Sequence, residues 1–317
     1  MNTTLIQTKD LKKYFKTPKG DLHAVDGVDI SIEKGKTLGV VGESGCGKST
    51  LGRVLLRLIE PTSGQVYFEG NNIVEYKNKE MMYMRQNMQI IFQDPYASLN
   101  PRMTISDIIA EPIKVCQTIT KKNEIENKVY ELMETVGLAE RLINSYPHEL
   151  DGGRRQRVGI ARALALNPKF IVCDEPVSSL DVSIQAQILN LMMDLQEEIG
   201  LTYMFITHDL SVVKHISNEI VVMYLGQCIE KADSHELFEN PLHPYTQALL
   251  DAIPIANLAS KNKKRKIIKG EVTSPINPKP GCRFYARCPK ANSDCMSPDI
   301  KLKEIKKGHY ISCVLYN

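Results

Sequence analysis

Residues 36–50 have the sequence KTLGVVGESGCGKST, in which an apolar strand pattern at 36–41 is followed by a glycine-rich turn and the start of a helix pattern. Within it, residues 42–49 match the pattern G-x-x-x-x-G-K-[ST], in the strand–turn–helix context that this motif requires. The helix is expected over residues 49–59, because Pro61 stops it. The glycines let backbone N–H groups surround a phosphate, and the N-terminus of the following helix favours an anion. We term residues 42–49 the phosphate-binding loop. It predicts a nucleotide site in which Lys48 contacts the β- and γ-phosphates and Ser49 binds Mg²⁺.

Alternating strand and helix patterns continue through the first 230 residues. Apolar runs at residues 169–173, 203–207 and 220–224 predict short buried strands, and residues 183–199 predict a helix because their apolar side chains recur at helical spacing. This order predicts an α/β fold with a mainly parallel sheet and helices packed on it. Residues 93–167 lack strand patterns and show helical ones instead, so we interpret them as a helical insertion.

Composition places the chain among ordinary folded proteins: of its 317 residues, 43% are hydrophobic and 24% charged, and the net charge is +3. No apolar run approaches the ~18–20 residues that span a bilayer, and the first residues lack the apolar core of a signal peptide. We therefore expect a cytoplasmic protein whose membrane role depends on partners. The basic run at residues 261–266 is interpreted as a solvated linker, and no nucleic-acid partner is expected.

A pair of carboxylates ends the apolar run at residues 170–175, FIVCDE. Asp174 can hold Mg²⁺ or its water, and Glu175 can polarise the attacking water. A strand followed by Asp-Glu is also a common surface turn, so the pair does not decide the function by itself. The run LDGGRRQR at residues 150–157 precedes it, and SLD at residues 179–181 and His208 follow it.

The order of these motifs, with Gln93 in IIFQDP, resembles the nucleotide-binding domain of ABC transporters over about residues 5–232. The resemblance implies an ABC-type P-loop fold with an antiparallel β edge, a nucleotide-binding domain at residues 1–232, and a helical subdomain at about 93–167. It implies that Gln93 senses Mg²⁺ and water, that His208 grips the γ-phosphate, and that Mg²⁺ is held through Ser49, Gln93 and Asp174. The residues that it implies for ATP binding are Tyr14, which would stack on adenine, and Gly42, Glu43, Ser44, Gly45, Cys46, Gly47, Lys48, Ser49 and Thr50.

In this family two cassettes face each other head to tail, and each ATP lies between the phosphate-binding loop of one and the signature of the other. The signature residues here are Asp151, Gly152, Gly153 and Arg154, and the resemblance places Asp181 at the interface between the cassettes. We therefore expect a second ABC ATPase, two membrane permease subunits and an extracytoplasmic solute-binding protein as partners. The chain is expected to lie peripherally at the cytoplasmic face of the cell membrane.

The signature departs from the family pattern, which has Ser at the position of Asp151 and Gln at that of Arg154. A carboxylate only accepts hydrogen bonds and repels the γ-phosphate, at about 4 kcal/mol for unit charges about 4 Å apart at an effective dielectric constant of about 20. Its value as a helix N-cap is smaller, roughly 0.5–2 kcal/mol. This predicts a poorly hydrolysing site at the signature, a competent site at Lys48 and Glu175, and hence a heterodimer of cassettes. A harmless substitution is the alternative.

Residues 240–250, NPLHPYTQALL, resemble the C-terminal extension of oligopeptide and dipeptide importer ATPases, so residues 233–317 are expected to form such an extension. The expected function is that of the ATP-hydrolysing subunit of a peptide importer. Nickel, metal-chelate and other small-solute importers share much of the pattern and remain alternatives. A non-hydrolysing regulatory cassette is a further one, against which Asp174, Glu175 and His208 argue.

Four cysteines crowd the end of the chain, separated by five, six and seventeen residues: Cys282, Cys288, Cys295 and Cys313. In related peptide-importer ATPases this arrangement holds an iron–sulfur cluster. Four thiolates satisfy either such a cluster or Zn²⁺, and reduced, unliganded cysteines are the remaining alternative. If a cluster forms, we expect it to staple a segment that has little apolar core of its own.

Overall fold

A computed structural model describes residues 3–253, 268, 270–298 and 300–316, so the basic run at 261–266 lies outside the described residues. The chain divides into two compact units, which we describe separately. Unit 1 comprises Met1–Thr3, Glu33–Lys36 and Glu75–Ile206. Unit 2 comprises Thr4–Ile32, Thr37–Val74 and Thr207–Asn317.

The first sheet of unit 2 contains the strand that precedes the phosphate-binding loop. Its order is β12-β13-β11-β10-β4, with β4 parallel to β10 and the other pairs antiparallel. All five residues of β4 are buried, as its apolar sequence predicts. Leu225 and Gly226 form the turn between β10 and β11 with φ of 43° and 85°, the conformation that two-residue hairpin loops favour. The strands are β4 (Thr37–Val41), β10 (Glu219–Tyr224), β11 (Gln227–Asp233), β12 (Lys303–Lys306) and β13 (His309–Ile311).

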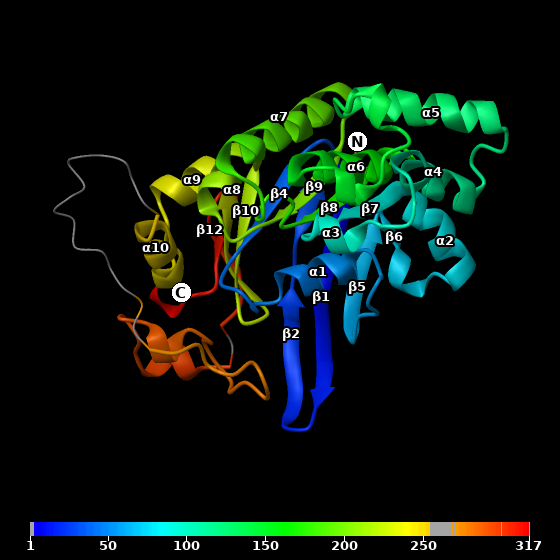
Figure 1. Ribbon diagram of the computed structural model, residues 1–317. Coiled ribbons are helices and arrows are strands. Elements are labelled where there is room, and N and C mark those ends of the chain that lie inside the picture. Colours follow the sequence, from blue (N-terminus) through cyan, green and yellow to red (C-terminus); the bar gives the residue numbers. More distant parts are fainter. Residues whose placement is uncertain (1–2, 254–267, 269, 299, 317) are drawn as a thin grey trace, which may run out of the picture. The chain divides into compact units, whose positions relative to one another are not determined.

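The second sheet of unit 2 is antiparallel, with the order β2-β1-β5-β6 and β3 paired to β1. Figure 1 shows β1 and β2 as a long pair of strands, and Tyr14 lies opposite His23 in their register. This sheet confirms the antiparallel edge expected for the fold class. Its strands are β1 (Thr4–Thr17), β2 (Gly20–Val28), β3 (Ser31–Glu33), β5 (Ser63–Phe68) and β6 (Asn71–Asn72).

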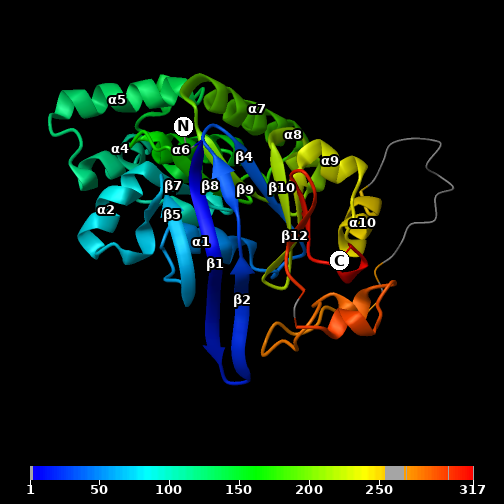
Figure 2. The ribbon, with the colours of Figure 1, turned by 180° about the vertical axis from the view of Figure 1, so that it is seen from behind.

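An aromatic core joins the C-terminal extension to the first sheet of unit 2. The ring centroid of Tyr224 on β10 lies 4.8 Å from that of Tyr245 and 5.3 Å from that of Phe284, in edge-on contacts that add to the energy of burial. Both views place the segment around residue 285, orange in Figures 1 and 2, next to α10. The helices are α1 (Lys48–Leu55), η1 (Ile73–Glu75), α8 (Leu210–Ile216), α9 (Ser234–Glu239), α10 (Pro244–Asp251), η5 (Tyr285–Arg287), η6 (Ser293–Met296) and η7 (Val314–Tyr316).

Unit 1 combines a parallel sheet, in the order β9-β8-β7, with helices. Within the described residues between 93 and 167 only helical elements occur, as the sequence predicts. No helix in the part of the chain that the structure describes is long and apolar enough to cross a membrane. The elements are α2 (Asn78–Asn87), β7 (Met88–Ile91), α3 (Pro95–Ser98), α4 (Ile105–Cys116), α5 (Lys122–Thr135), η2 (Glu140–Leu142), η3 (Pro147–Glu149), α6 (Gly152–Leu164), β8 (Phe170–Asp174), α7 (Val182–Ile199) and β9 (Thr202–Ile206).

The predicted strands agree with β4, β8, β9 and β10 within a residue or so, whereas the helix expected over residues 49–59 ends at Leu55. The chain turns after this helix at Arg57, whose φ is 47°. The Arg57 guanidinium holds the turn through two contacts. Its Nη1 donates to the Ile73 carbonyl at 2.7 Å, and its Nη2 pairs with Glu60 at 2.8 Å.

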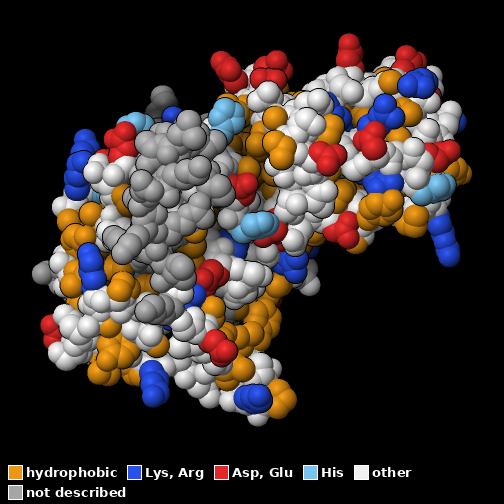
Figure 3. Space-filling view, turned by 60° about the vertical axis from the view of Figure 1, so that its left-hand side comes forward, with side chains coloured by type: hydrophobic (Ala, Val, Ile, Leu, Met, Phe, Trp, Pro, Cys, Tyr) orange, Lys and Arg blue, Asp and Glu red, His pale blue; other side chains and the backbone are white. Residues whose placement is uncertain are grey.

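On the described face shown in Figure 3, acidic and basic side chains are interspersed.

Candidate nucleotide-binding site

The phosphate-binding loop in unit 2 holds a buried cation. Lys48 is only 5% exposed, and its Nζ donates to the carbonyls of Gly42, at 2.8 Å, and Glu43, at 3.0 Å. Among the described residues no carboxylate oxygen lies within ion-pair distance of this ammonium. The Lys48 Nζ also lies 3.8 Å from the Cys46 sulfur. A buried charge whose hydrogen-bond partners are all neutral is costly unless an anion compensates it. The loop therefore fits a phosphate group.

No side chain caps the start of α1. Gly47 is the N-cap residue. Its φ is 103°, and a Cβ at this position would lie 1.9 Å from the carbonyl oxygen of Ala24, so glycine is required. Ser49 and Thr50 lie in the first turn of α1. The free N–H groups of a helix N-terminus bind phosphate well.

Tyr14, the predicted adenine contact, lies on β1 in unit 2 and is already partly engaged. Its ring stacks on His23, with centroids 3.8 Å apart, and its hydroxyl donates to Asp26. His23 therefore covers one face of the ring, and stacking on adenine stays a prediction for the other face. No sequence motif indicates His23, because its position opposite Tyr14 depends on the register of β1 and β2.

His208, also in unit 2, lies exposed between β9 and α8. Asp209, the next residue, caps α8 by accepting a hydrogen bond from the Ser211 N–H at 2.8 Å. The cap holds the backbone directly after His208 in place.

Two predicted catalytic residues meet in unit 1. Asp174 ends β8 and is 2% exposed, and Glu175 follows it with a φ of 48°, a conformation that costs energy in a non-glycine residue. The Glu175 N–H donates to the Ile206 carbonyl at 2.9 Å, and its Oε2 accepts a hydrogen bond from Gln93 Nε2 at 2.8 Å. Because β7 and β8 are adjacent and parallel, Gln93 after β7 and Glu175 after β8 reach the same edge of the sheet.

The signature in unit 1 begins α6. Asp151 caps the helix, accepting a hydrogen bond from the Arg154 N–H at 2.8 Å, while Arg154 Nε lies 3.5 Å from its Oδ2. Arg154 thus offsets part of the negative charge that the sequence places here. A Cβ at Gly153 would lie 2.6 Å from Cγ2 of Ile184, so a larger residue would require that side chain to shift. Asp181 is exposed at the start of α7.

The four C-terminal cysteines of unit 2 share one region, and Cys295 and Cys313 are buried. The Cys282 N–H donates to the Cys295 carbonyl at 2.7 Å. Burial, with a smaller contribution from the neighbouring cysteines, raises the pKa of the Cys282 thiol to about 11. Over the described ranges, no group of three or more His, Cys, Asp or Glu side chains is arranged to hold a metal ion. The side chains as placed therefore do not fit the expected cluster or Zn²⁺.

Residues that the sequence did not indicate connect the extension to the phosphate-binding loop within unit 2. Arg287 pairs with Glu43, with its Nη1 2.8 Å from Oε2 and its Nη2 3.0 Å from Oε1. Arg283 pairs with Asp26, the acceptor for Tyr14. No local motif signals these pairs, because Glu43 and Arg287 are 244 residues apart.

Comparison with known proteins gives two family matches. Residues 25–178 match the ABC transporter model, and residues 229–295 match the model for the oligopeptide/dipeptide transporter C-terminal region. The chain is 51% identical to the oligopeptide transport ATP-binding protein AppF of Bacillus subtilis, over 99% of this chain and 98% of that protein. It is 50% identical to the dipeptide transport ATP-binding protein DppF of Haemophilus influenzae, over 98% and 97%, and to the oligopeptide transport ATP-binding protein OppF of Escherichia coli, over 97% and 92%.

Solved structures agree with the fold. A dimeric ATP-binding cassette in a post-hydrolysis state, bound to ADP and Pi, is 29% identical, with a TM-score of 0.67 over 73% of this chain and 99% of that chain. A nucleotide-free cassette from an ABC transporter is 28% identical, with a TM-score of 0.67 over 78% and 98%. The chain has an ABC-type P-loop fold, and it belongs to the ATP-binding proteins of the oligopeptide and dipeptide ABC transporter family.

Proposed function

We propose that this chain hydrolyses MgATP to power the import of peptides through partner permease subunits. The observation that carries the ATPase function is the buried Lys48 ammonium, which donates to the Gly42 and Glu43 carbonyls and to the Cys46 sulfur at the start of α1, a helix without a side-chain cap. The relatives named for oligopeptide and dipeptide transport, and the match of residues 229–295 to that transporter's C-terminal region, support peptides as the transported solute.

In this proposal the residues of unit 2 bind the triphosphate. Lys48 and the N–H groups at the start of α1 hold the β- and γ-phosphates, and His208 contacts the γ-phosphate. Ser49, Gln93 and Asp174 would hold Mg²⁺, which when bound neutralises charge on the phosphate oxygens.

Glu175 is proposed as the general base that accepts a proton from the attacking water. The hydrogen bond from Gln93 orients its carboxylate, and its strained backbone, bonded to the Ile206 carbonyl, fixes where the side chain begins. An oriented base saves entropy in the hydrolytic step.

The test is Glu175→Gln. We expect ATP turnover to fall about a hundredfold or more, because general-base catalysis is lost, while MgATP binding is retained. Glu198→Gln, at an exposed position of α7 in the same unit, is the matched control. Undiminished turnover in the Glu175 variant, measured by phosphate release, would show that another group activates the water.

We propose that the chain acts with a second, different ABC ATPase, two permeases and a solute-binding protein, at the cytoplasmic face of the membrane. The departure at Asp151 supports two unlike cassettes, although its pairing with Arg154 reduces the expected repulsion. Copurification of the assembled transporter tests this directly: a complex containing two copies of this chain and no other ATPase would overturn the heterodimer.

The four cysteines remain a proposal for an iron–sulfur cluster, with Zn²⁺ as the alternative. Their shared region, and the hydrogen bond from the Cys282 N–H to the Cys295 carbonyl, support it. Iron, sulfide and zinc content of anaerobically purified protein decides: a colourless, zinc-containing sample would refute the cluster, and a metal-free one both metals.

A further inference from the structure

The C-terminal extension holds Glu43, the second residue of the phosphate-binding loop, by its side chain. Arg287 contacts both carboxylate oxygens in the two-pronged geometry that makes arginine–carboxylate pairs strong. The Arg287 side chain is 8% exposed and that of Glu43 28%, so water screens the pair only in part. The hydrogen bond to Glu43 raises the pKa of Arg287, so the guanidinium stays charged.

The extension also holds the backbone of Glu43. Its N–H donates to the hydroxyl of Tyr245 at 2.9 Å, and the Tyr245 side chain is fully buried on α10. Burial raises the Tyr245 pKa, which keeps the hydroxyl neutral. Arg287 Nη1 in turn lies 3.2 Å from the hydroxyl of Tyr224 on β10, which ties the arginine to the sheet. Arg287 therefore holds the side chain of Glu43, and Tyr245 holds its backbone.

Glu43 places a negative charge in the loop that is expected to receive a polyanion. Without a partner this carboxylate would repel the phosphates and would leave the beginning of the loop free to move. Arg287 compensates that charge, and the Tyr245 contact fixes the backbone. The effect on affinity follows from electrostatics and from preorganisation of the loop.

We propose that Arg287 and Tyr245 are positioning residues for nucleotide binding, through which the C-terminal extension sets the affinity of the phosphate-binding loop for MgATP. The inference rests on the proposed ATPase function. It goes beyond a stapling role for the extension, because it predicts that the extension changes the dissociation constant of the chain for MgATP.

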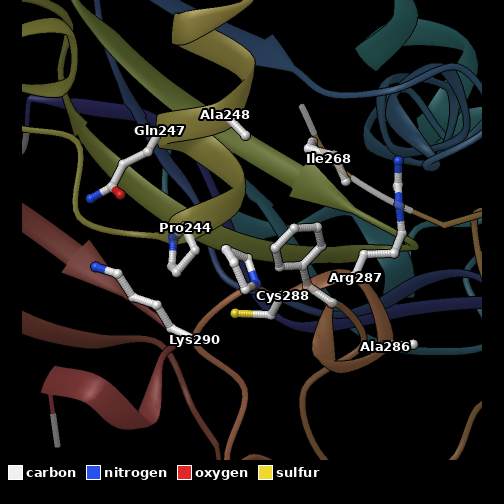
Figure 4. Close-up of a pocket in the computed structure, with 10 residues that line it drawn as sticks. Pro244, Gln247, Ala248, Ile268, Ala286, Arg287, Cys288 and Lys290 are labelled. Atoms are coloured by element: carbon white, nitrogen blue, oxygen red, sulfur yellow. The ribbon is translucent and has the colours of Figure 1, made fainter. Parts of the chain in front are cut away.

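The positioning role is separable from the cysteines. Arg287 and Cys288 are consecutive and line a pocket of about 620 Å³ together with Phe284 and Pro244. Figure 4 shows that their side chains extend in different directions, the guanidinium away from the Cys288 sulfur. A substitution of Arg287 therefore removes the contact with Glu43 without removing a thiol.

The test measures MgATP binding to the full-length chain by titration calorimetry. We expect Arg287→Ala to weaken binding about tenfold, the effect of losing a charge-assisted, partly exposed pair. Adding Glu43→Gln to that variant should restore affinity to within about threefold of the wild type, because the unpaired charge is gone. Tyr245→Phe should weaken binding less, and Lys290→Ala, exposed in the same segment, should not change it.

The outcomes separate positioning from general support of the fold. In turnover assays KM should rise in Arg287→Ala while kcat stays near the wild-type value. If Arg287→Ala binds MgATP as the wild type does, or if Glu43→Gln fails to rescue it, the inference is overturned while the proposed function stands. A wild-type chain that binds no MgATP would overturn the proposed function and this inference with it.

Discussion

Helices α1 and α6 both begin at glycine-containing turns, but the side chain at the N-terminus of α1 is a cation and that at the N-terminus of α6 is a carboxylate. α1 follows Gly47 without a side-chain cap and carries Lys48 at its first position. α6 follows Asp151, whose carboxylate already accepts a hydrogen bond from the Arg154 N–H. Both helices have the same backbone dipole, so the difference lies in the N-cap. The N-terminus of α1 has no side-chain cap, whereas that of α6 is capped by a carboxylate of its own chain.

The largest effect is expected for Lys48→Ala. The substitution removes the buried cation that compensates the phosphates, and we expect MgATP affinity to fall about a thousandfold. Lys19→Ala, at the exposed turn between β1 and β2 of the same unit, serves as control. Near-normal binding by the Lys48 variant in calorimetry would mean that α1 does not form the anion site.

Alanine at the glycines tests how differently the two turns are built. Gly47→Ala forces a side chain onto a φ of 103° and into the Ala24 carbonyl, so we expect a loss of about 3 kcal/mol or more in unfolding free energy. Gly153→Ala meets only a methyl group of Ile184 and gains helix propensity, so we expect about 1 kcal/mol. Urea denaturation compares them, and equal losses would contradict the distinction.

His243, the N-cap of α10, differs from both Gly47 and Asp151 because its side chain is neutral and titratable. Its Nδ1 accepts a hydrogen bond from the Tyr245 N–H at 3.1 Å, and burial lowers its pKa from 6.5 to about 4. Between these values the unfolded chain binds more protons than the folded one, so stability falls as pH decreases, by about 3 kcal/mol at most.

His243→Asn keeps a capping side chain and should remove that contribution from the pH dependence. Denaturant midpoints between pH 7 and pH 4 measure the effect. An unchanged pH slope in the variant would show that other groups cause the acid sensitivity.

The smallest effect is expected at Asp151. Asp151→Ser replaces an exposed, partly neutralised carboxylate with a hydroxyl donor, and we expect ATP turnover of the assembled transporter to rise about two- to fivefold. Arg141→Ala, an exposed position on η2, is a matched control in the same unit. If turnover and nucleotide stoichiometry stay the same, the hypothesis that the two ATP sites differ in their rate of hydrolysis should be abandoned.

Local sequence determined the strands, the phosphate-binding loop and the Asp174–Glu175 pair. Each depends on a few consecutive residues: the apolar run of β4, the glycines and lysine that follow it, and the carboxylates that end β8. Periodicity and turn chemistry act over such short distances, so they can be recognised without knowing which elements meet.

Only the tertiary structure decided which distant side chains pair. The motifs of the sequence predicted Gln93 and Glu175 as catalytic residues, but their hydrogen bond depends on β7 and β8 being neighbours in the sheet. These motifs gave no sign of His23 against Tyr14 or of Arg287 on Glu43. These contacts depend on strand register and on how the extension packs against β10, which long-range burial sets and no local pattern encodes.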